Sequence, residues 1–144
     1  MKILLIEDSF LQGDWLCSEL QRALDGEVMW IAVESEVASR LDEIESFAPD
    51  VALIDVMLRW ADPRPDAPPT PPDWDLYTAG LRCRHYLASR RGTALAPVIF
   101  YTVLSEAEVR SKLPELPTGV RYLGKDSDVD PLVQLIREVT ARQP

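Results

Sequence analysis

The chain has 144 residues and a formal net charge of −9, from 24 acidic and 15 basic residues. This length suits a single domain, over residues 1–144, that buries roughly 70% of its unfolded surface. The negative charge argues against direct binding to nucleic acid or to an anionic membrane. The apolar run near the N-terminus, Ile3–Ile6, is too short for a signal peptide or a membrane span, so we expect a cytoplasmic protein.

Apolar runs and amphipathic segments alternate along the chain. Residues 2–7 read as a buried strand, and residues 9–24 read as a helix with Leu16, Leu20 and Leu24 at helical spacing. The further predicted elements are strands over 27–33, 50–57, 97–103 and 120–124 and helices over 35–47, 75–89, 105–113 and 129–142. Strands that alternate with helices in this way predict an α/β fold, with one doubly wound parallel sheet of five strands, (βα)5.

A proline-rich segment, about residues 59–74, interrupts this alternation after the third predicted strand. Proline lacks a backbone N–H, so a run of prolines favours extended backbone outside helices and sheets. Two interpretations stay open. The segment is a tolerated surface insertion, or it is a lid or docking arm beside the strand ends. In the second case Trp60 and Trp74 would anchor it, and Arg64 would bring a charge near the site.

Polar residues gather at the carboxyl ends of the predicted strands, where parallel sheets of this kind bind ligands. They are Glu7, Asp8, Asp55, Thr102 and Lys125. Each has a structural explanation of its own; Asp8 or Ser9, for example, would cap the first helix. Together, the three carboxylates would repel one another unless a hard cation such as Mg²⁺ lies among them. A carboxylate beside such an ion can act as a nucleophile toward a phosphoryl group, whose charge a lysine and a hydroxyl then stabilise.

The stretches LLIEDS, DVALIDVML, VIFYT and YLGK occur in this order at the strand ends. With them, almost the whole chain resembles the receiver domain of two-component response regulators, which has a flavodoxin-like fold. The resemblance implies that Asp55 is the phosphoacceptor and that Thr102 and Lys125 contact the phosphoryl group. It further implies an Mg²⁺ site and a switch aromatic. The implied metal ligands are Glu7, Asp8, Asp55 and the backbone carbonyl of Met57, and the switch aromatic is Tyr122.

The function that the resemblance implies is a signalling switch, not an enzyme with a separate substrate. A sensor histidine kinase or a phosphotransfer protein would phosphorylate Asp55 with Mg²⁺, and the chain would catalyse only its own phosphorylation and dephosphorylation. Thr102 and Tyr122 would then change the surface formed by residues 105–142. That surface would bind a downstream protein, and a homodimer formed through it is also compatible with the resemblance.

The sequence departs from the family pattern at several positions. Arg59 and Asp126 stand where the family usually has proline, Leu76 where it commonly has glycine, and Val103 where it usually has a small residue. A cis peptide bond before residue 126 is therefore not expected. The departures keep open a pseudo-receiver that signals through protein contacts without phosphorylation.

A different class of protein on a similar sheet is a hydrolase or a mononucleotide-binding protein. The sequence argues against both, because it has neither a glycine-rich phosphate loop nor a Gly-x-Ser-x-Gly turn.

Overall fold

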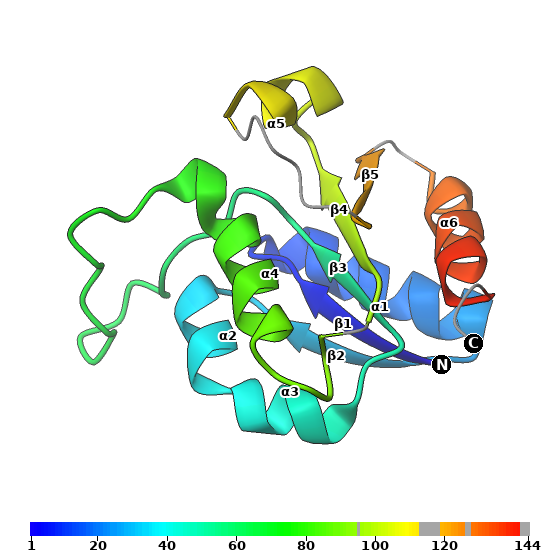
Figure 1. Cartoon of the computed structure of the whole chain (residues 1–144), viewed down its shortest axis with the longest axis horizontal. Helices are drawn as coiled ribbons and strands as arrows, with labels where there is room; N and C mark the ends of the chain where they lie inside the picture. Colours follow the sequence, from blue (N-terminus) through cyan, green and yellow to red (C-terminus); the bar gives the residue numbers. More distant parts are fainter. Residues whose placement is uncertain (95, 113–118, 126–127, 142–144) are drawn as a thin grey trace.

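The strands form one parallel sheet. The computed structural model describes residues 1–94, 96–112, 119–125 and 128–141. The sheet has the strand order β2-β1-β3-β4-β5, and every pairing in it is parallel (Figure 1). Its strands are β1 (Lys2–Ile6), β2 (Glu27–Ile31), β3 (Val51–Ile54), β4 (Val98–Thr102) and β5 (Arg121–Gly124). The doubly wound α/β fold predicted from the alternating pattern is confirmed.

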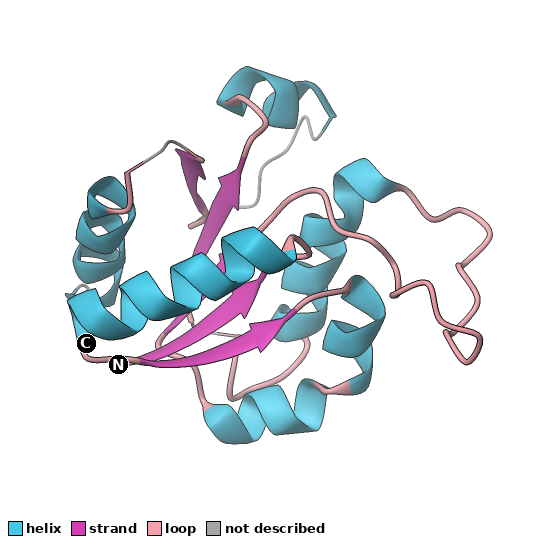
Figure 2. Cartoon of the chain, turned by 180° about the vertical axis from the view of Figure 1, so that it is seen from behind, coloured by secondary structure: helices cyan, strands magenta, loops and turns pink. Residues whose placement is uncertain are grey.

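Helices cover both faces of the sheet. They are α1 (Phe10–Leu24), α2 (Glu34–Ser39), α3 (Leu41–Phe47), α4 (Ala79–Ala88), α5 (Glu106–Lys112) and α6 (Asp130–Ala141). Helices α1 and α6 lie on one face, and the other helices lie on the opposite face (Figures 1 and 2). Ile3 and Leu5 of β1 pack with α1 and α6, whereas Leu4 and Ile6 pack with the other helices. Strands buried on both faces need the continuous apolar runs seen in the sequence. Among the described residues, no helix combines the length and apolar character needed to cross a bilayer.

Several elements differ from the predicted bounds. The helix predicted over 35–47 is two helices, because Arg40 leaves helical geometry with φ −109° and ψ 20°. Buried Val37 and Ile44 lie on either side of this break, so the apolar spacing conceals it. The helix predicted over 75–89 begins as the 3₁₀ turn η1 (Leu76–Thr78), whose first turn Asp75 caps. Residues 113 and 142, predicted to end two helices, lie outside the described residues, as does Asp126.

The proline-rich segment extends away from the sheet as an irregular loop between Ile54 and η1 (Figure 1). Its first residues meet the start of α2. The backbone N–H groups of Glu34 and Ser35 donate to the carbonyl oxygens of Arg59 and Trp60, at 3.0 and 2.8 Å. Val33, the N-cap residue of α2, makes no side-chain capping hydrogen bond. The loop backbone therefore supplies acceptors that the first turn of a helix requires.

The far end of the loop is fixed by a buried carboxylate. Glu34 is fully buried, and its carboxylate accepts two hydrogen bonds from the guanidinium of Arg82, at 2.5 and 2.9 Å. The indole N–H of Trp74 donates to the same carboxylate at 2.6 Å, and the hydroxyl of Tyr86 donates at 3.3 Å. The indole of Trp60 donates to the carbonyl of Pro68 at 3.2 Å. Trp74 thus ties the end of the loop to α2, and Trp60 makes a hydrogen bond within the loop.

Candidate functional site

The strand register brings three acidic side chains together. Ile6 pairs with both Ile31 and Ile54, so Glu7 and Asp55 follow neighbouring strands at the same edge of the sheet. The chain crosses to opposite sides of the sheet after β1 and β3, which makes this edge the switch point where such folds bind ligands. Single carboxylate oxygens of Glu7, Asp8 and Asp55 all lie within 4.8 Å of one another. The acidic cluster predicted from separate strand ends is therefore one site.

The cluster lies in an open pocket with a volume of about 440 Å³. Side chains from the strand ends, from the start of α1, from the start of the proline-rich segment and from η1 line it. They are Glu7, Asp8, Ser9, Gln12, Asp55, Met57, Arg59, Leu76, Val103 and Lys125. The proline-rich segment thus contributes Arg59 to the pocket, and η1, which follows it, contributes Leu76.

Lys125 joins two of the carboxylates. Its ammonium group donates to Asp55 Oδ2 at 2.7 Å and to Glu7 Oε2, and its side chain is only 7% exposed. Burial alone would lower the pKa of Lys125, but the carboxylates of Asp55 and Glu7 raise it above its ordinary value. Burial raises the pKa of Glu7, and the attraction of Lys125 offsets this only in part. The three carboxylates thus outnumber their two cationic neighbours, Lys125 and Arg59, and the pocket favours additional positive charge.

Backbone N–H groups orient the carboxylates. Ser9 N–H donates to Glu7 Oε1 at 3.0 Å, and Met57 N–H donates to Asp55 Oδ1 at 3.2 Å. Of the two capping candidates, Ser9 is the N-cap of α1, since its hydroxyl accepts from Gln12 N–H at 3.4 Å. The carboxylate of Asp8 therefore remains with the acidic cluster. Carboxylate oxygens this close together are hard ligands of the kind that Mg²⁺ prefers, so the residues fit such an ion.

Thr102 and Tyr122 contact the same backbone segment. Thr102 is fully buried, and its hydroxyl accepts from Leu104 N–H at 3.4 Å. Tyr122 is half-buried, and its hydroxyl donates to the carbonyl of Leu104. From this strand end it is Val103, 67% exposed, that lines the pocket. The residues that follow β4 are therefore held by both side chains for which the sequence predicts a switching role.

Two residues at the site were not found by sequence reasoning. The indole of Trp30 donates to the carbonyl of Glu7 at 2.8 Å, and its ring packs where a Cβ on Gly13 would lie. Gly80 in α4 approaches the backbone of Asp55 so closely that a Cβ would lie 2.4 Å from the Asp55 carbonyl oxygen. An isolated glycine inside a helical pattern is the signal that could have revealed this close approach.

Gly80→Ala should destabilise the protein although alanine is the better helix former. The new methyl group meets backbone atoms, which cannot rotate away, so α4 or the turn at Asp55 has to shift. We expect a loss of about 1–3 kcal/mol of unfolding free energy, measured by urea denaturation. Gly124→Ala is the control, because its Cβ would meet only the Tyr122 hydroxyl, at 3.8 Å, in ordinary van der Waals contact. Equal stability of Gly80→Ala and the wild type would contradict the close approach.

The arginine that lines the acidic pocket is Arg59, and not Arg64 as the interpretation of the segment as a lid or docking arm supposes. Arg64 lines a separate groove between the loop and α2. Arg59 lines the acidic pocket, and its backbone N–H donates to Asp8 Oδ2 at 3.0 Å. The residue that replaces the family's usual proline thus places its side chain at the site.

Comparisons with known proteins support the fold. No family model and no curated protein matches the sequence. The structure is similar to the receiver domain of a sensor histidine kinase from Pseudomonas aeruginosa, solved with magnesium in its active-site cleft, with TM-score 0.67, 18% identity and 97% of each chain covered. It is also similar to the BeF3-activated receiver domain of RstA from Klebsiella pneumoniae, with TM-score 0.68, 20% identity and coverage of 99% of this chain and 100% of that one.

A third solved structure is the non-phosphorylated receiver domain of HemR from Leptospira biflexa. It aligns with TM-score 0.69 and 20% identity, over 99% of this chain and 96% of that chain. At sequence identities this low, the similarity supports the fold alone. The chemistry of the site has to be argued from the residues of this chain. The chain therefore has the fold of the receiver domains of two-component signalling proteins, as its strand-end motifs predict.

Proposed function

We propose that this chain is a phosphoacceptor receiver domain. In this proposal Asp55 takes a phosphoryl group from a sensor histidine kinase or a phosphotransfer protein in the presence of Mg²⁺. The observation that carries the proposal is the position of Asp55, which lies 2.7 Å from the ammonium of Lys125 and within the three-carboxylate cluster. This position supports the proposal, because a carboxylate at the switch point can act as a nucleophile toward a phosphoryl group whose charge the neighbouring ammonium offsets.

In the proposed reaction an oxygen of Asp55 attacks phosphorus while the bond from phosphorus to the donor's imidazole nitrogen breaks. The electron pair of that bond leaves with the imidazole. Lys125 offsets the charge that stays on the phosphoryl oxygens. Glu7, Asp8, Asp55 and the carbonyl of Met57 are the proposed Mg²⁺ ligands, and the bound ion would supply the remaining positive charge.

The proposed switch uses the hydrogen bonds at Leu104. If the hydroxyl of Thr102 turns toward the phosphoryl group, it leaves the N–H of Leu104, 3.4 Å away. The segment whose carbonyl Tyr122 holds then moves, and the surface formed by α5, β5 and α6 changes. Such a change is a two-state equilibrium biased by one new charged group. A downstream protein or a second copy of the chain would recognise the changed surface.

Intact-mass measurement tests the proposal. After incubation with Mg²⁺ and acetyl phosphate, we expect one added phosphoryl group on the wild type. We expect none on Asp55→Asn and none when Mg²⁺ is withheld. An adduct that persists on Asp55→Asn would place the acceptor elsewhere and would sink the assignment of Asp55.

The alternative function is a pseudo-receiver that binds partners without being phosphorylated. The contact of Arg59 with Asp8 favours it, because a guanidinium already stands at one of the proposed metal ligands. A wild type that takes up neither the phosphoryl group nor beryllium fluoride, at any Mg²⁺ concentration, would support this alternative.

A further inference from the structure

Arg59 makes a set of contacts that joins the acidic cluster to the proline-rich loop. Its guanidinium donates to the carbonyl of Asp8 at 2.9 Å, and its Nε lies 3.5 Å from Asp8 Oδ2. The same guanidinium lies 3.6 Å from Asp62, an acid within the loop. The Arg59 side chain is 46% exposed, so it can move without opening the core. A partly exposed cation therefore lies between a carboxylate of the cluster and a carboxylate of the loop.

We propose that Arg59 is an internal counter-ion that competes with Mg²⁺ for Asp8 and pairs with Asp62 when the metal binds. The proposal rests on the proposed function, because it takes Asp8 as a ligand of Mg²⁺. A divalent ion bound to Asp8 repels a guanidinium a few ångströms away. Asp62 already lies within reach of that guanidinium, so the displaced charge keeps a partner.

The backbone geometry allows this exchange. The Arg59 N–H donates to Asp8 Oδ2 at 3.0 Å, and the Arg59 carbonyl accepts from Glu34 N–H at 3.0 Å. Both bonds hold the main chain of Arg59 in place while its side chain turns. Only the guanidinium has to move, from the acidic pocket toward the loop.

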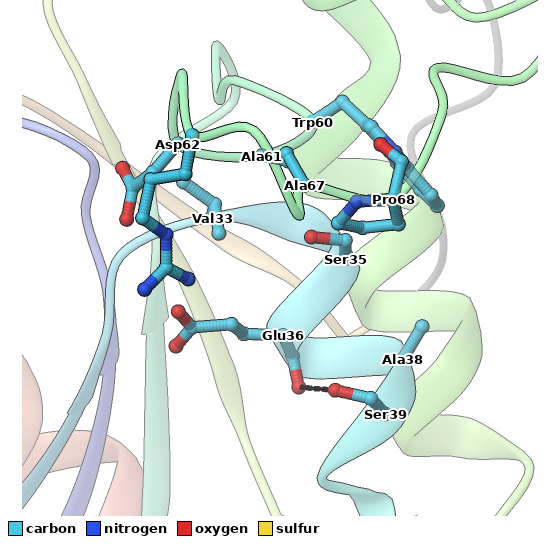
Figure 3. Close-up of a pocket in the computed structure, with 11 residues that line it drawn as sticks. Val33, Ser35, Glu36, Ala38, Ser39, Trp60, Ala61, Asp62, Ala67 and Pro68 are labelled. Carbon is cyan, nitrogen blue, oxygen red and sulfur yellow. Dashed lines mark hydrogen bonds between the residues drawn. The ribbon is translucent and has the colours of Figure 1, made fainter.

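Asp62, the second partner of Arg59, lines a groove of about 430 Å³ between the loop and α2. Asp62 and Trp60 line it from the loop, and Ser35, Glu36 and Ser39 line it from α2 (Figure 3). Pairing of Arg59 with Asp62 would bring positive charge toward the rim of this groove. Binding of the metal would thereby change the charge at the groove, a surface of the loop that does not line the acidic pocket.

Titration with Mg²⁺ alone, followed by isothermal titration calorimetry, tests the competition. We expect Arg59→Ala to bind Mg²⁺ about three- to ten-fold more tightly than the wild type. Arg64→Ala removes the same charge from the same loop but not from the acidic pocket, so its affinity should stay within about two-fold of the wild type. A damaged site would weaken binding, so tighter binding cannot come from general disruption.

A double-mutant cycle tests the second partner. Asp62→Asn should weaken Mg²⁺ binding in the wild type, because the displaced guanidinium loses its alternative carboxylate. The same substitution should have a smaller effect in the Arg59→Ala background, where no guanidinium has to be accommodated. Equal effects in both backgrounds would overturn the exchange between Asp8 and Asp62.

The outcomes separate this inference from the proposed function. If the wild type binds Mg²⁺ and Arg59→Ala binds it no more tightly, the competition is wrong and the proposed metal site stands. If only Arg59→Ala binds at millimolar Mg²⁺, the competition is supported in its strongest form. If neither protein binds Mg²⁺, both the inference and the proposed metal site fail.

Discussion

Glu34→Ala is expected to lower the free energy of unfolding by about 3 kcal/mol. This value is at the lower end of the losses measured when one partner of a buried ion pair is removed. The guanidinium of Arg82, 30% exposed, loses the carboxylate to which it donates two hydrogen bonds. The indole of Trp74 and the hydroxyl of Tyr86 lose the same acceptor. Denaturation in urea, followed by circular dichroism, measures the loss.

Glu36→Ala is the matched control for this prediction. Glu36 also lies in α2 and also faces an arginine, Arg40, but at 3.6 Å and with its side chain 36% exposed. Exposed pairs of this kind are worth about 0–1 kcal/mol, so Glu36→Ala should change stability little. If the two alanine variants unfold at the same urea concentration, the carboxylate of Glu34 does not hold the loop, α2 and α4 together.

Lys125→Met should destabilise the metal-free protein by about 3 kcal/mol near pH 8, because it leaves Glu7 and Asp55 without the cation that joins them. The effect depends on pH. Loss of Lys125 removes the attraction that lowers the pKa of Glu7, so that pKa, already raised by burial, rises further. When the pKa of a carboxyl group is higher in the folded than in the unfolded state, its ionisation lowers the free energy of unfolding at pH values above the folded-state pKa. This loss of stability diminishes as the pH falls through the folded-state pKa. The variant should therefore be closest to the wild type near pH 5.

Mg²⁺ gives this second prediction its sharpest readout. The metal would bring positive charge to Glu7 and Asp55, which have lost their ammonium partner in the variant, so we expect it to raise the melting temperature of Lys125→Met more than that of the wild type. Lys112→Met, which removes an exposed lysine in α5, is the control and should show the wild-type response. An equal response of Lys125→Met and the wild type would show that Lys125 and the metal act on different charges.

The strands and the acidic cluster could be predicted because their signals are local. Each buried strand is a short apolar run, and the parallel sheet then places Glu7 and Asp55 side by side whatever the details of the helices. Either Asp8 or Ser9 could cap α1, and the sequence alone does not distinguish between them. In the structure the hydroxyl of Ser9 accepts from Gln12 N–H and so caps the helix.

Contacts between distant parts of the chain could not be predicted. Glu34 and Arg82 are 48 positions apart, and Asp8 and Arg59 are 51 positions apart. No periodicity connects such residues. For the same reason the sequence could not show that Arg59, and not Arg64, lines the acidic pocket. The direction in which an irregular proline-rich loop leaves the sheet is set by what it packs against.

The hydrogen bonds at the start of α2 make the order of chain synthesis matter. Glu34 and Ser35 leave the ribosome before the residues whose carbonyls accept from them, Arg59 and Trp60. Arg82, which pairs with the carboxylate of Glu34, is synthesised later than Arg59 and Trp60. The first turn of α2 therefore cannot reach its final form until the proline-rich loop and the start of α4 have emerged. In a hybrid protein, exchange of the loop alone would remove the backbone acceptors of the first turn of α2, and exchange of α4 alone would remove the arginine that pairs with Glu34. We therefore expect the loop and α4 to be transplantable only together.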